Sequence, residues 1–263
     1  MIEFQDVTKS FDDEVVLRNI SFKVRRGETL IILGESGSGK STVLKLILGL
    51  IKPDSGKILI EDRDITYMSE RELVSARRNI GMVFQEGALF DSLPVRDNVG
   101  YRLYEEGALE EMEVDLEVEK HLGFVGLEEA IDKMPAELSG GMKRRVGIAR
   151  ALVGSPEMIL YDEPTAGLDP ITKRTIVELM IKLRDMQGVT SIFVTHDLHA
   201  ASIIATEYAA SAENGDVDYK SDGGSGIAST INFIMLMDGR ICFHGGYQEL
   251  KTSRVPYVKS FVK

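Results

Sequence analysis

Apolar and polar positions follow two periods along the chain, and together they predict an α/β fold. Residues 2–7 alternate apolar and polar side chains, as a half-buried strand does. Short apolar runs without alternation are typical of strands buried on both faces, and such runs occupy residues 29–33, 80–84, 158–161 and 190–194. Helical spacing over residues 173–186 separates the last two runs, so we expect parallel strands joined by a right-handed crossover.

Three further parts surround this core. Residues 2–7 and 15–24 predict an antiparallel β subdomain, and Asp238-Gly239 between two apolar runs predicts a hairpin. Residues 93–153 read as a mostly helical subdomain, whose last helix, over residues 143–153, is amphipathic and basic. We therefore expect one domain over residues 1–263, with a mainly parallel core sheet.

An insertion is predicted at about residues 206–231. Residues 209–229 are rich in Gly, Ser, Asp and Ala, which favours a flexible surface loop; a docking or regulatory element is the alternative.

The negative charge of the chain is concentrated in one segment rather than spread along the sequence. The net charge is −11, but residues 105–119 hold eight acids and no Lys or Arg. No basic stripe suited to nucleic acid phosphates is present, so nucleic acid is not expected as a partner. The sequence contains no apolar run long enough to span a bilayer and no secretory signal pattern, and its single cysteine forms no internal disulfide, so we expect a cytosolic chain.

The sharpest motif directly follows the apolar run at residues 29–33 and opens a helix predicted over residues 40–50. It fits the phosphate-binding P-loop pattern G-x-x-x-x-G-K-[ST] and consists of Gly34, Glu35, Ser36, Gly37, Ser38, Gly39, Lys40, Ser41 and Thr42. Glycines let backbone N–H groups approach a phosphate closely, and the helix N-terminus adds positive dipole. Lys40 supplies charge to the β- and γ-phosphates of a nucleotide, and the Ser41 hydroxyl can ligate Mg²⁺. The motif predicts a P-loop NTPase, without saying which.

Two adjacent acids end the apolar strand at residues 158–161. Side chains alternate along a strand, so Asp162 and Glu163 face different directions and serve different purposes. We expect Asp162 to hold Mg²⁺ and Glu163 to polarise the attacking water, which makes Glu163 the candidate general base.

Together, the ordered motifs resemble the ABC-type ATPase family along essentially the whole chain. They are the P-loop, Leu138-Ser139-Gly140-Gly141, Asp162-Glu163, Gly167-Leu168-Asp169 and His196, with Gln85 after a strand and Phe11 at an adenine-stacking position. Met142 departs from the family, in which many members have Gln, but the preceding serine and glycines make the phosphate contacts.

The resemblance implies a head-to-tail dimer with two ATP molecules between the chains. Ser139, Gly140 and Gly141 of one chain would cap the γ-phosphate held by the P-loop of the other, again with a helix N-terminus aimed at an anion. Each motif occurs once, so a working site needs a second copy of the chain.

The remaining motif residues receive roles from the same resemblance. His196 would contact the γ-phosphate and hold Glu163 and the water in place, and Asp169 would cross the dimer interface. Gln85 would sense Mg²⁺ and pass the state of the site to a membrane partner. His199 follows His196 at helix spacing, but no carboxylate or thiol cluster completes a metal site, which favours a surface histidine.

Within the family, two segments resemble the ATPases of Mla/Mce-type lipid transporters. These are Gly87-Ala88-Leu89-Phe90-Asp91-Ser92-Leu93 and the tail over residues 254–261. The implied partners are transmembrane permease subunits and an MCE-type substrate-binding protein, with the ATPase peripheral on the cytoplasmic face of the inner (cell) membrane. The implied cargo is a phospholipid or another hydrophobic molecule.

Other members of the family remain as alternatives. They are the ATPase of a different ABC importer and a soluble ATPase of iron–sulfur cluster assembly, whose length is similar. Sustained heptads between P-loop and signature motif, which chromosome and repair ATPases would carry, are absent from the sequence, and so is the second cassette of a translation factor.

Overall fold

A computed structural model describes residues 1–212, 217–221 and 230–262. Its contacts divide the chain into two compact units, where the sequence predicts one domain with subdomains. The first unit contains residues 1–78 and 181–263, and the second contains residues 79–180.

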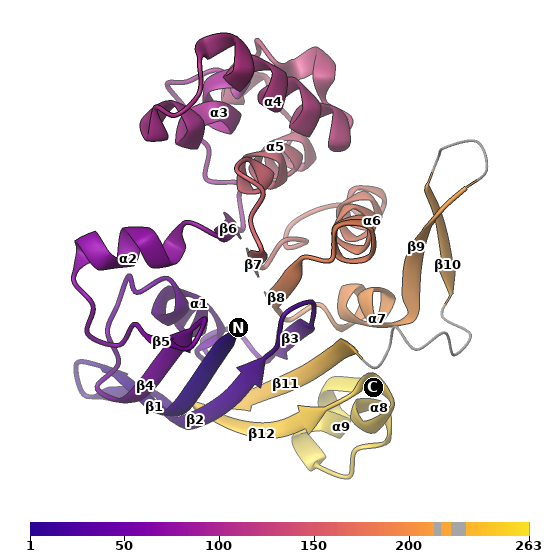
Figure 1. Ribbon diagram of the computed structural model, residues 1–263. Helices are drawn as coiled ribbons and strands as arrows, with labels where there is room; N and C mark the ends of the chain where they lie inside the picture. Colours follow the sequence, from indigo (N-terminus) through magenta and orange to yellow (C-terminus); the bar gives the residue numbers. More distant parts are fainter. Residues whose placement is uncertain (213–216, 222–229, 263) are drawn as a thin grey trace. The chain divides into compact units, whose positions relative to one another are not determined.

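A four-stranded antiparallel sheet forms the start of the first unit, as the alternating pattern predicts (Figure 1). Its order is β2-β1-β4-β5, with β1 (Ile2–Phe11), β2 (Glu14–Val24), β4 (Ser55–Ile60) and β5 (Arg63–Asp64). Alternate side chains of β1 are buried, and the Phe4 ring stacks on Phe22 with centroids 4.5 Å apart. Strand β1 runs on to Phe11, beyond the predicted end at residue 7, so Phe11 lies beside the turn into β2.

The core strands of the first unit lie in the order β12-β11-β3-β8. Their bounds are β3 (Thr29–Leu33), β8 (Thr190–Thr195), β11 (Ile231–Met237) and β12 (Arg240–Gly245). The pairs β11–β3 and β3–β8 are parallel, whereas β12 returns antiparallel to β11 through the predicted Asp238-Gly239 turn. Every residue of β3 and β8 is buried, which is why both read as continuous apolar runs.

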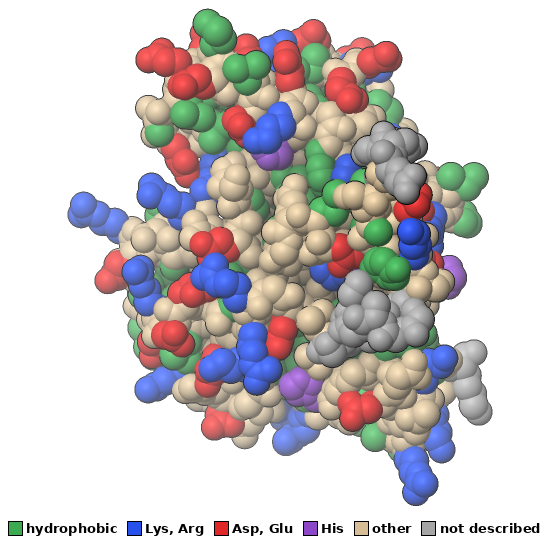
Figure 2. All heavy atoms as spheres, turned by 45° about the vertical axis from the view of Figure 1, so that its right-hand side comes forward, with side chains coloured by type: hydrophobic (Ala, Val, Ile, Leu, Met, Phe, Trp, Pro, Cys, Tyr) green, Lys and Arg blue, Asp and Glu red, His purple; other side chains and the backbone are tan. Residues whose placement is uncertain are grey.

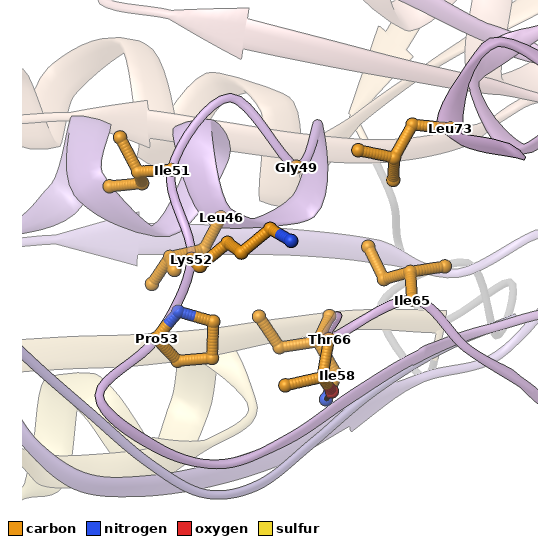
Figure 3. A pocket seen from close by; sticks show the side chains of 9 residues that line it. All are labelled: Leu46, Gly49, Ile51, Lys52, Pro53, Ile58, Ile65, Thr66 and Leu73. Carbon is orange, nitrogen blue, oxygen red and sulfur yellow. Dashed lines mark hydrogen bonds between the residues drawn. The ribbon is translucent and has the colours of Figure 1, made fainter. Parts of the chain in front are cut away.

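Two helices complete the part of the first unit near the P-loop. Helix α1 (Lys40–Ile47) follows the P-loop, and α2 (Glu70–Arg77) begins at a capping box in which the Ser69 N–H donates to Glu72 at 2.8 Å. Figure 3 shows the apolar seam between them, where Leu73 faces Gly49 and no space remains for a water molecule. A Cβ at Gly49 would lie 2.7 Å from Leu73 Cδ2, so this close packing depends on glycine.

The predicted flexible insertion contains regular structure. Helix α7 (Leu198–Thr206) leads into an antiparallel hairpin of β9 (Glu207–Ser211) and β10 (Val217–Ser221), in which Val217 pairs with Ser211. The prediction of an irregular loop is therefore wrong over these strands, while residues 213–216 and 222–229 lie outside the described residues.

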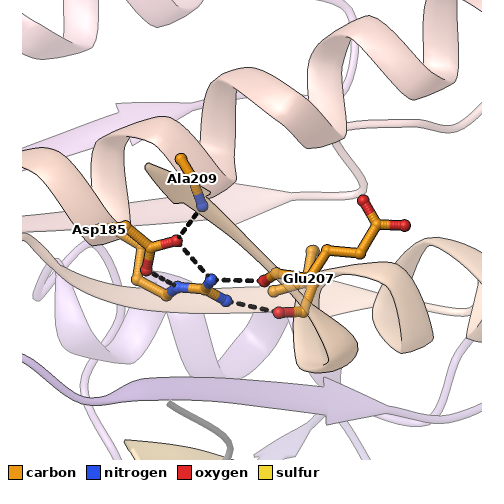
Figure 4. Close-up of polar contacts among 5 residues, drawn as sticks. Asp185, Glu207 and Ala209 are labelled. Atoms are coloured by element: carbon orange, nitrogen blue, oxygen red, sulfur yellow. Dashed lines mark hydrogen bonds and ion pairs between the residues drawn. The ribbon is translucent and has the colours of Figure 1, made fainter. Parts of the chain in front are cut away.

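A buried ion pair holds the start of this hairpin. Arg184, near the end of α6 (Pro170–Gln187), donates to Asp185 and to the carbonyls of Ile204 and Glu207. Asp185 also accepts the Ala209 N–H at 2.8 Å, as Figure 4 shows. The described chain then ends in α8 (Tyr247–Thr252) and α9 (Pro256–Val262).

The second unit contains the predicted helical subdomain. Parallel strands β6 (Ile80–Val83) and β7 (Met158–Asp162) pair with each other, and the helices include α3 (Val95–Glu106), α4 (Glu111–Phe124) and α5 (Gly140–Leu152). Acidic side chains gather at the top of Figure 2, in the helical part that carries the acidic run of the sequence. Arg96 offsets part of that charge by pairing with Asp115 at 2.7 Å and Asp132 at 3.2 Å. Among the helices that the structure describes, none is both long and apolar enough to cross a membrane.

Candidate nucleotide-binding site

The P-loop of the first unit has the tight backbone that its glycines predict. It leaves buried β3 and ends where α1 begins at Lys40. Gly39 has φ of 97°, and a Cβ at this position would lie 2.7 Å from Leu17 Cδ2. At Gly34, a Cβ would lie 2.5 Å from Ser38 Oγ and 2.8 Å from the Leu236 carbonyl oxygen. The loop thus folds against its neighbours at distances that only glycine permits.

The polar groups of this loop suit a phosphate ligand. Lys40 is only 6% exposed, and its ammonium group donates to the carbonyls of Gly34 at 2.9 Å and Glu35 at 3.0 Å, which holds the charge at the loop. The Ser38 hydroxyl is buried without a hydrogen-bond partner among the described residues. Leaving such a group unpaired costs about 1–3 kcal/mol, which a phosphate oxygen would relieve.

A polar cavity of about 430 Å³ lies beside the P-loop within the first unit. Its walls are Glu14, Val15 and Val16 of β2, Glu35, Ser36, Gly37 and Ser38 of the P-loop, Met237, Asp238 and Gly239 of the β11–β12 hairpin, and Tyr257 of α9. Phe11 pairs with the wall residue Glu14 across the β1–β2 turn, and its side chain is 43% exposed. The exposed ring is therefore available to stack on a flat group such as adenine.

Tyr257 lines this cavity and contacts the P-loop, which the sequence motifs do not predict. Its hydroxyl accepts the backbone N–H of Glu35 at 3.3 Å, and burial raises the pKa of the phenol. Helix α9 therefore touches the first residue after Gly34 of the P-loop. In the sequence, Tyr257 lies in the tail over residues 254–261, which resembles lipid transporter ATPases. No nucleotide-binding motif includes this tyrosine.

His196 and the P-loop begin at the same edge of the sheet. On the parallel strands β3 and β8, Leu33 pairs with Thr195, so Gly34 and His196 are the next residues of neighbouring strands. Asp197 then caps α7 by accepting the Ala200 N–H at 3.0 Å. His196 and His199 are both exposed, in agreement with a loop histidine and a surface histidine.

In the second unit, strand register likewise gathers Gln85, Asp162 and Glu163. Val83 at the end of β6 pairs with Tyr161 of β7, so the chain reaches Gln85 and Asp162 at the same sheet edge. Glu163 follows with φ of 47°, an uncommon conformation for a residue with a side chain, which turns the chain sharply at this point. Gln85 and Asp162 carry the oxygen ligands that Mg²⁺ prefers.

The signature residues lie at the start of α5. Ser139 is the N-cap, and its hydroxyl accepts the Met142 N–H at 3.3 Å. Ser139 and Gly140 are exposed, whereas Gly141 is buried so closely against Thr172 that a Cβ would lie 2.4 Å from Thr172 Cγ2. The exposed end of a 13-residue helix can therefore face an anion, as the motif predicts.

Asp169 has a local contact that the sequence interpretation missed. Its carboxylate accepts the N–H groups of Thr172 at 3.0 Å and Ile171 at 3.1 Å in the first turn of α6. Hydrogen bonding by Thr172 is the main reason that the pKa of Asp169 is lowered. The aspartate that follows Gly167-Leu168 thus caps a helix within its own chain.

Comparison with known proteins agrees with this geometry. The sequence profile of the ABC transporter family matches residues 17–166, and the chain belongs to this family. It is similar to the Intermembrane phospholipid transport system ATP-binding protein MlaF of Escherichia coli, with 36% identity over 262 residues that cover 100% of this chain and 88% of that protein. Protein TRIGALACTOSYLDIACYLGLYCEROL 3, chloroplastic, of Arabidopsis thaliana is 39% identical over 268 residues, covering 99% of this chain and 73% of that protein.

Two further proteins are similar to this chain: a relative named for a different cargo, and a protein of solved structure. Methionine import ATP-binding protein MetN 1 of Listeria innocua is 40% identical over 82% of this chain and 64% of that protein. The dimeric ATP-binding cassette MJ0796 bound to ADP and Pi has a TM-score of 0.78 at 31% identity, covering 94% of this chain and 98% of that one. The chain is thus the ATP-binding subunit of an ABC transporter, an ATPase that uses ATP with Mg²⁺, in a family whose cassettes form dimers and serve membrane permeases.

Proposed function

We propose that the chain energises the transport of a phospholipid or another hydrophobic molecule, as the ATPase of a Mla/Mce-type transporter. The observation that carries this proposal is the similarity to MlaF, a protein named for intermembrane phospholipid transport, over the whole of this chain. MetN 1, named for methionine import, is matched over a smaller share of both chains. The proposed partners are permease subunits and an MCE-type substrate-binding protein, with this chain on the cytoplasmic face of the inner (cell) membrane.

In the proposed site, the first unit binds the nucleotide. Phe11 stacks on adenine, while the P-loop N–H groups and Lys40 bind the phosphates. Ser41 would hold Mg²⁺ together with Gln85 and Asp162, and the ion would neutralise charge on the transferred phosphoryl group. His196 contacts the γ-phosphate. The pairing of Leu33 with Thr195 supports this role, because the loop of His196 begins beside Gly34.

Hydrolysis needs the second unit and a second chain. Glu163 accepts a proton from water that attacks the γ-phosphorus, the bond from that phosphorus to the bridging oxygen breaks, and ADP leaves with that electron pair. Ser139, Gly140 and Gly141 of the other chain cap the same γ-phosphate through the N-terminus of α5, and Asp169 lies at the interface of the two chains.

The transport assignment can be tested by purification from membranes. A tagged full chain is extracted in mild detergent and its partners are identified by mass spectrometry, with bound lipid measured as organic phosphate. We expect a polytopic permease and an MCE-domain protein carrying phospholipid. A permease with a binding protein for a water-soluble solute, or only soluble iron–sulfur assembly proteins, would contradict the proposal.

A further inference from the structure

Arg144 is a buried cation in the second unit that the motif roles leave unused. It lies on α5, and only 4% of it is exposed. Its Nη1 donates to the carbonyl oxygens of Pro164 at 2.7 Å and Ala166 at 3.0 Å. Burial lowers the pKa of the guanidinium, and the charge of Glu86 opposes that effect. A buried charge is costly, so these two bonds are strong constraints on the carbonyls that receive them.

The segment that Arg144 holds comes directly after Glu163. Glu163 has φ of 47° and Gly167 has φ of 73°, so the backbone turns sharply at both ends of the segment. The Ala166 N–H donates to the Glu163 carbonyl at 3.1 Å, which closes the turn. A non-glycine residue in this conformation persists only when its surroundings hold it, and Arg144 supplies contacts just beyond it.

Neighbouring arginines of α5 bind other loops in the same way. Arg145 donates to the carbonyls of Val125 at 3.1 Å and Gly126 at 3.3 Å, after α4. Arg150 donates to the carbonyls of Gly87 at 2.7 Å and Ala88 at 2.8 Å, two and three residues after Gln85. Three arginines on one helix thus bind six carbonyls, and of the three it is Arg144 that binds the segment directly after Glu163.

We propose that Arg144 is a positioning residue that orients Glu163 and links it to the signature end of α5. This inference rests on the roles proposed above for Glu163 and Ser139. In the two-chain site, Ser139 serves the ATP on the other chain's P-loop, while Glu163 serves the ATP on its own. A helix that starts at Ser139 and binds the Glu163 segment through Arg144 therefore joins the two ATP sites of the dimer.

The first test separates orientation of Glu163 from nucleotide binding. Arg144→Met keeps the aliphatic length and removes both donors, Arg144→Lys keeps a charged donor, and Arg145→Met is the matched control one residue along. The kcat and KM for MgATP are measured on the full chain with its membrane partners. Misplacing a catalytic group by about 1 Å costs about 10²-fold, so kcat should fall by about that factor in Arg144→Met, with KM within about three-fold.

The other two variants define the cause of that loss. Arg144→Lys should recover at least about ten-fold of the lost kcat, since an ammonium group can donate to both carbonyls. Arg145→Met should keep kcat within about three-fold of the unchanged chain. Equal losses in Arg144→Met and Arg145→Met, or a loss confined to KM, would overturn the inference.

A double-variant cycle asks whether Arg144 acts through Glu163. Single-turnover hydrolysis of radiolabelled ATP is compared in Glu163→Gln with and without Arg144→Met. We expect the second change to add less than about three-fold, because residues that act as a unit are not additive. Losses that multiply would show that Arg144 acts independently of Glu163 and would overturn the inference.

Two further outcomes have distinct meanings. Near-normal hydrolysis in Glu163→Gln itself would contradict the proposed role of Glu163, whatever Arg144→Met does. If Arg144→Met does not fold, as judged by thermal unfolding, the same cycle is run with Arg144→Lys, which should lower kcat less, leave KM unchanged and add nothing to Glu163→Gln. Multiplying losses there would again overturn the inference.

Discussion

Leu33 and Thr195 face each other on the parallel strands β3 and β8, so Gly34 and His196 leave the sheet as neighbours. The P-loop and the loop of His196 therefore start from one carboxyl edge. Ligands of open α/β sheets bind at this edge because loops from several strands meet there. In the second unit, the pairing of Val83 with Tyr161 brings Gln85 and Asp162 to a common edge by the same rule.

Removing the Lys40 ammonium group should weaken nucleotide binding and abolish turnover. A charged hydrogen bond contributes about 1.5–3 kcal/mol, so ATP affinity in Lys40→Ala should fall by about one to two orders of magnitude. Titration calorimetry with ATP and a phosphate-release assay measure the two effects. Lys45→Ala, which removes an exposed lysine from the same helix, is the control and should leave both unchanged. Normal hydrolysis in Lys40→Ala would remove the P-loop from the mechanism.

The buried pair that holds the β9–β10 hairpin should matter for stability. The side chains of Arg184 and Asp185 are 4% and 11% exposed. In Asp185→Ala, Arg184 would lose its carboxylate partner while still buried, which typically costs about 3–5 kcal/mol in the free energy of unfolding. Urea unfolding followed by circular dichroism measures this change.

The exposed pair of the same hairpin provides the comparison. Lys220 and Asp218 lie 3.8 Å apart with side chains 53% and 55% exposed, so Lys220→Ala should change the free energy of unfolding by less than about 1 kcal/mol. Similar effects of Asp185→Ala and Lys220→Ala would mean that the buried pair does not stabilise the first unit.

Sequence patterns predict the core strands and the loops at their carboxyl ends well, because both signals depend only on residues close together in the sequence. The apolar runs become β3 and β8, and the glycine motif becomes the loop between β3 and α1. The hairpin of β9 and β10 is not predicted, because the Gly, Ser and Asp residues around it favour a loop. A signal was available, since Val217 and Tyr219 alternate with Asp218 and Lys220, as strand residues do.

The contacts of Arg144 and Tyr257 could not be predicted in this way. Both bind backbone groups far along the chain, at Pro164 and Glu35 respectively. Any residue type can supply a backbone carbonyl or N–H, so no sequence pattern marks such a partner. The sequence shows only that residues 143–153 are basic. It does not distinguish Arg144, which is buried, from Lys143, which is not.

The thiol of Cys242 should react slowly at neutral pH. Burial raises its pKa above the ordinary value of 9.0, and Sγ donates weakly to the Met235 carbonyl at 3.4 Å. Because the thiolate is the nucleophile, the rate of alkylation by iodoacetamide should keep rising to a higher pH in the folded chain than in the chain unfolded in urea. Intact-mass measurement follows the reaction in both states. A folded chain whose rate levels off at the same pH as the unfolded chain, or at a lower pH, would contradict this prediction.

In the proposed mechanism, two chains form each ATP site and Glu163 activates the water. Glu163→Gln keeps the shape of the side chain but removes the charge, so hydrolysis should fall by about 10²–10⁴-fold. Binding should survive, because Lys40, Ser41 and the P-loop backbone remain. ATP bound between two chains favours the closed dimer through its higher affinity for that state, so blocked hydrolysis should make the dimer accumulate.

Cross-linking between chains measures this accumulation directly. Cysteines replace the exposed Glu35 of the P-loop and the exposed Glu137 two residues before Ser139. Cys242 is changed to serine, and a flexible bis-maleimide joins the two introduced cysteines. With MgATP, the account predicts extensive cross-linking between chains in Glu163→Gln and little in Lys40→Ala. Equal cross-linking in both variants, or none in Glu163→Gln despite tight ATP binding, would contradict the two-chain site.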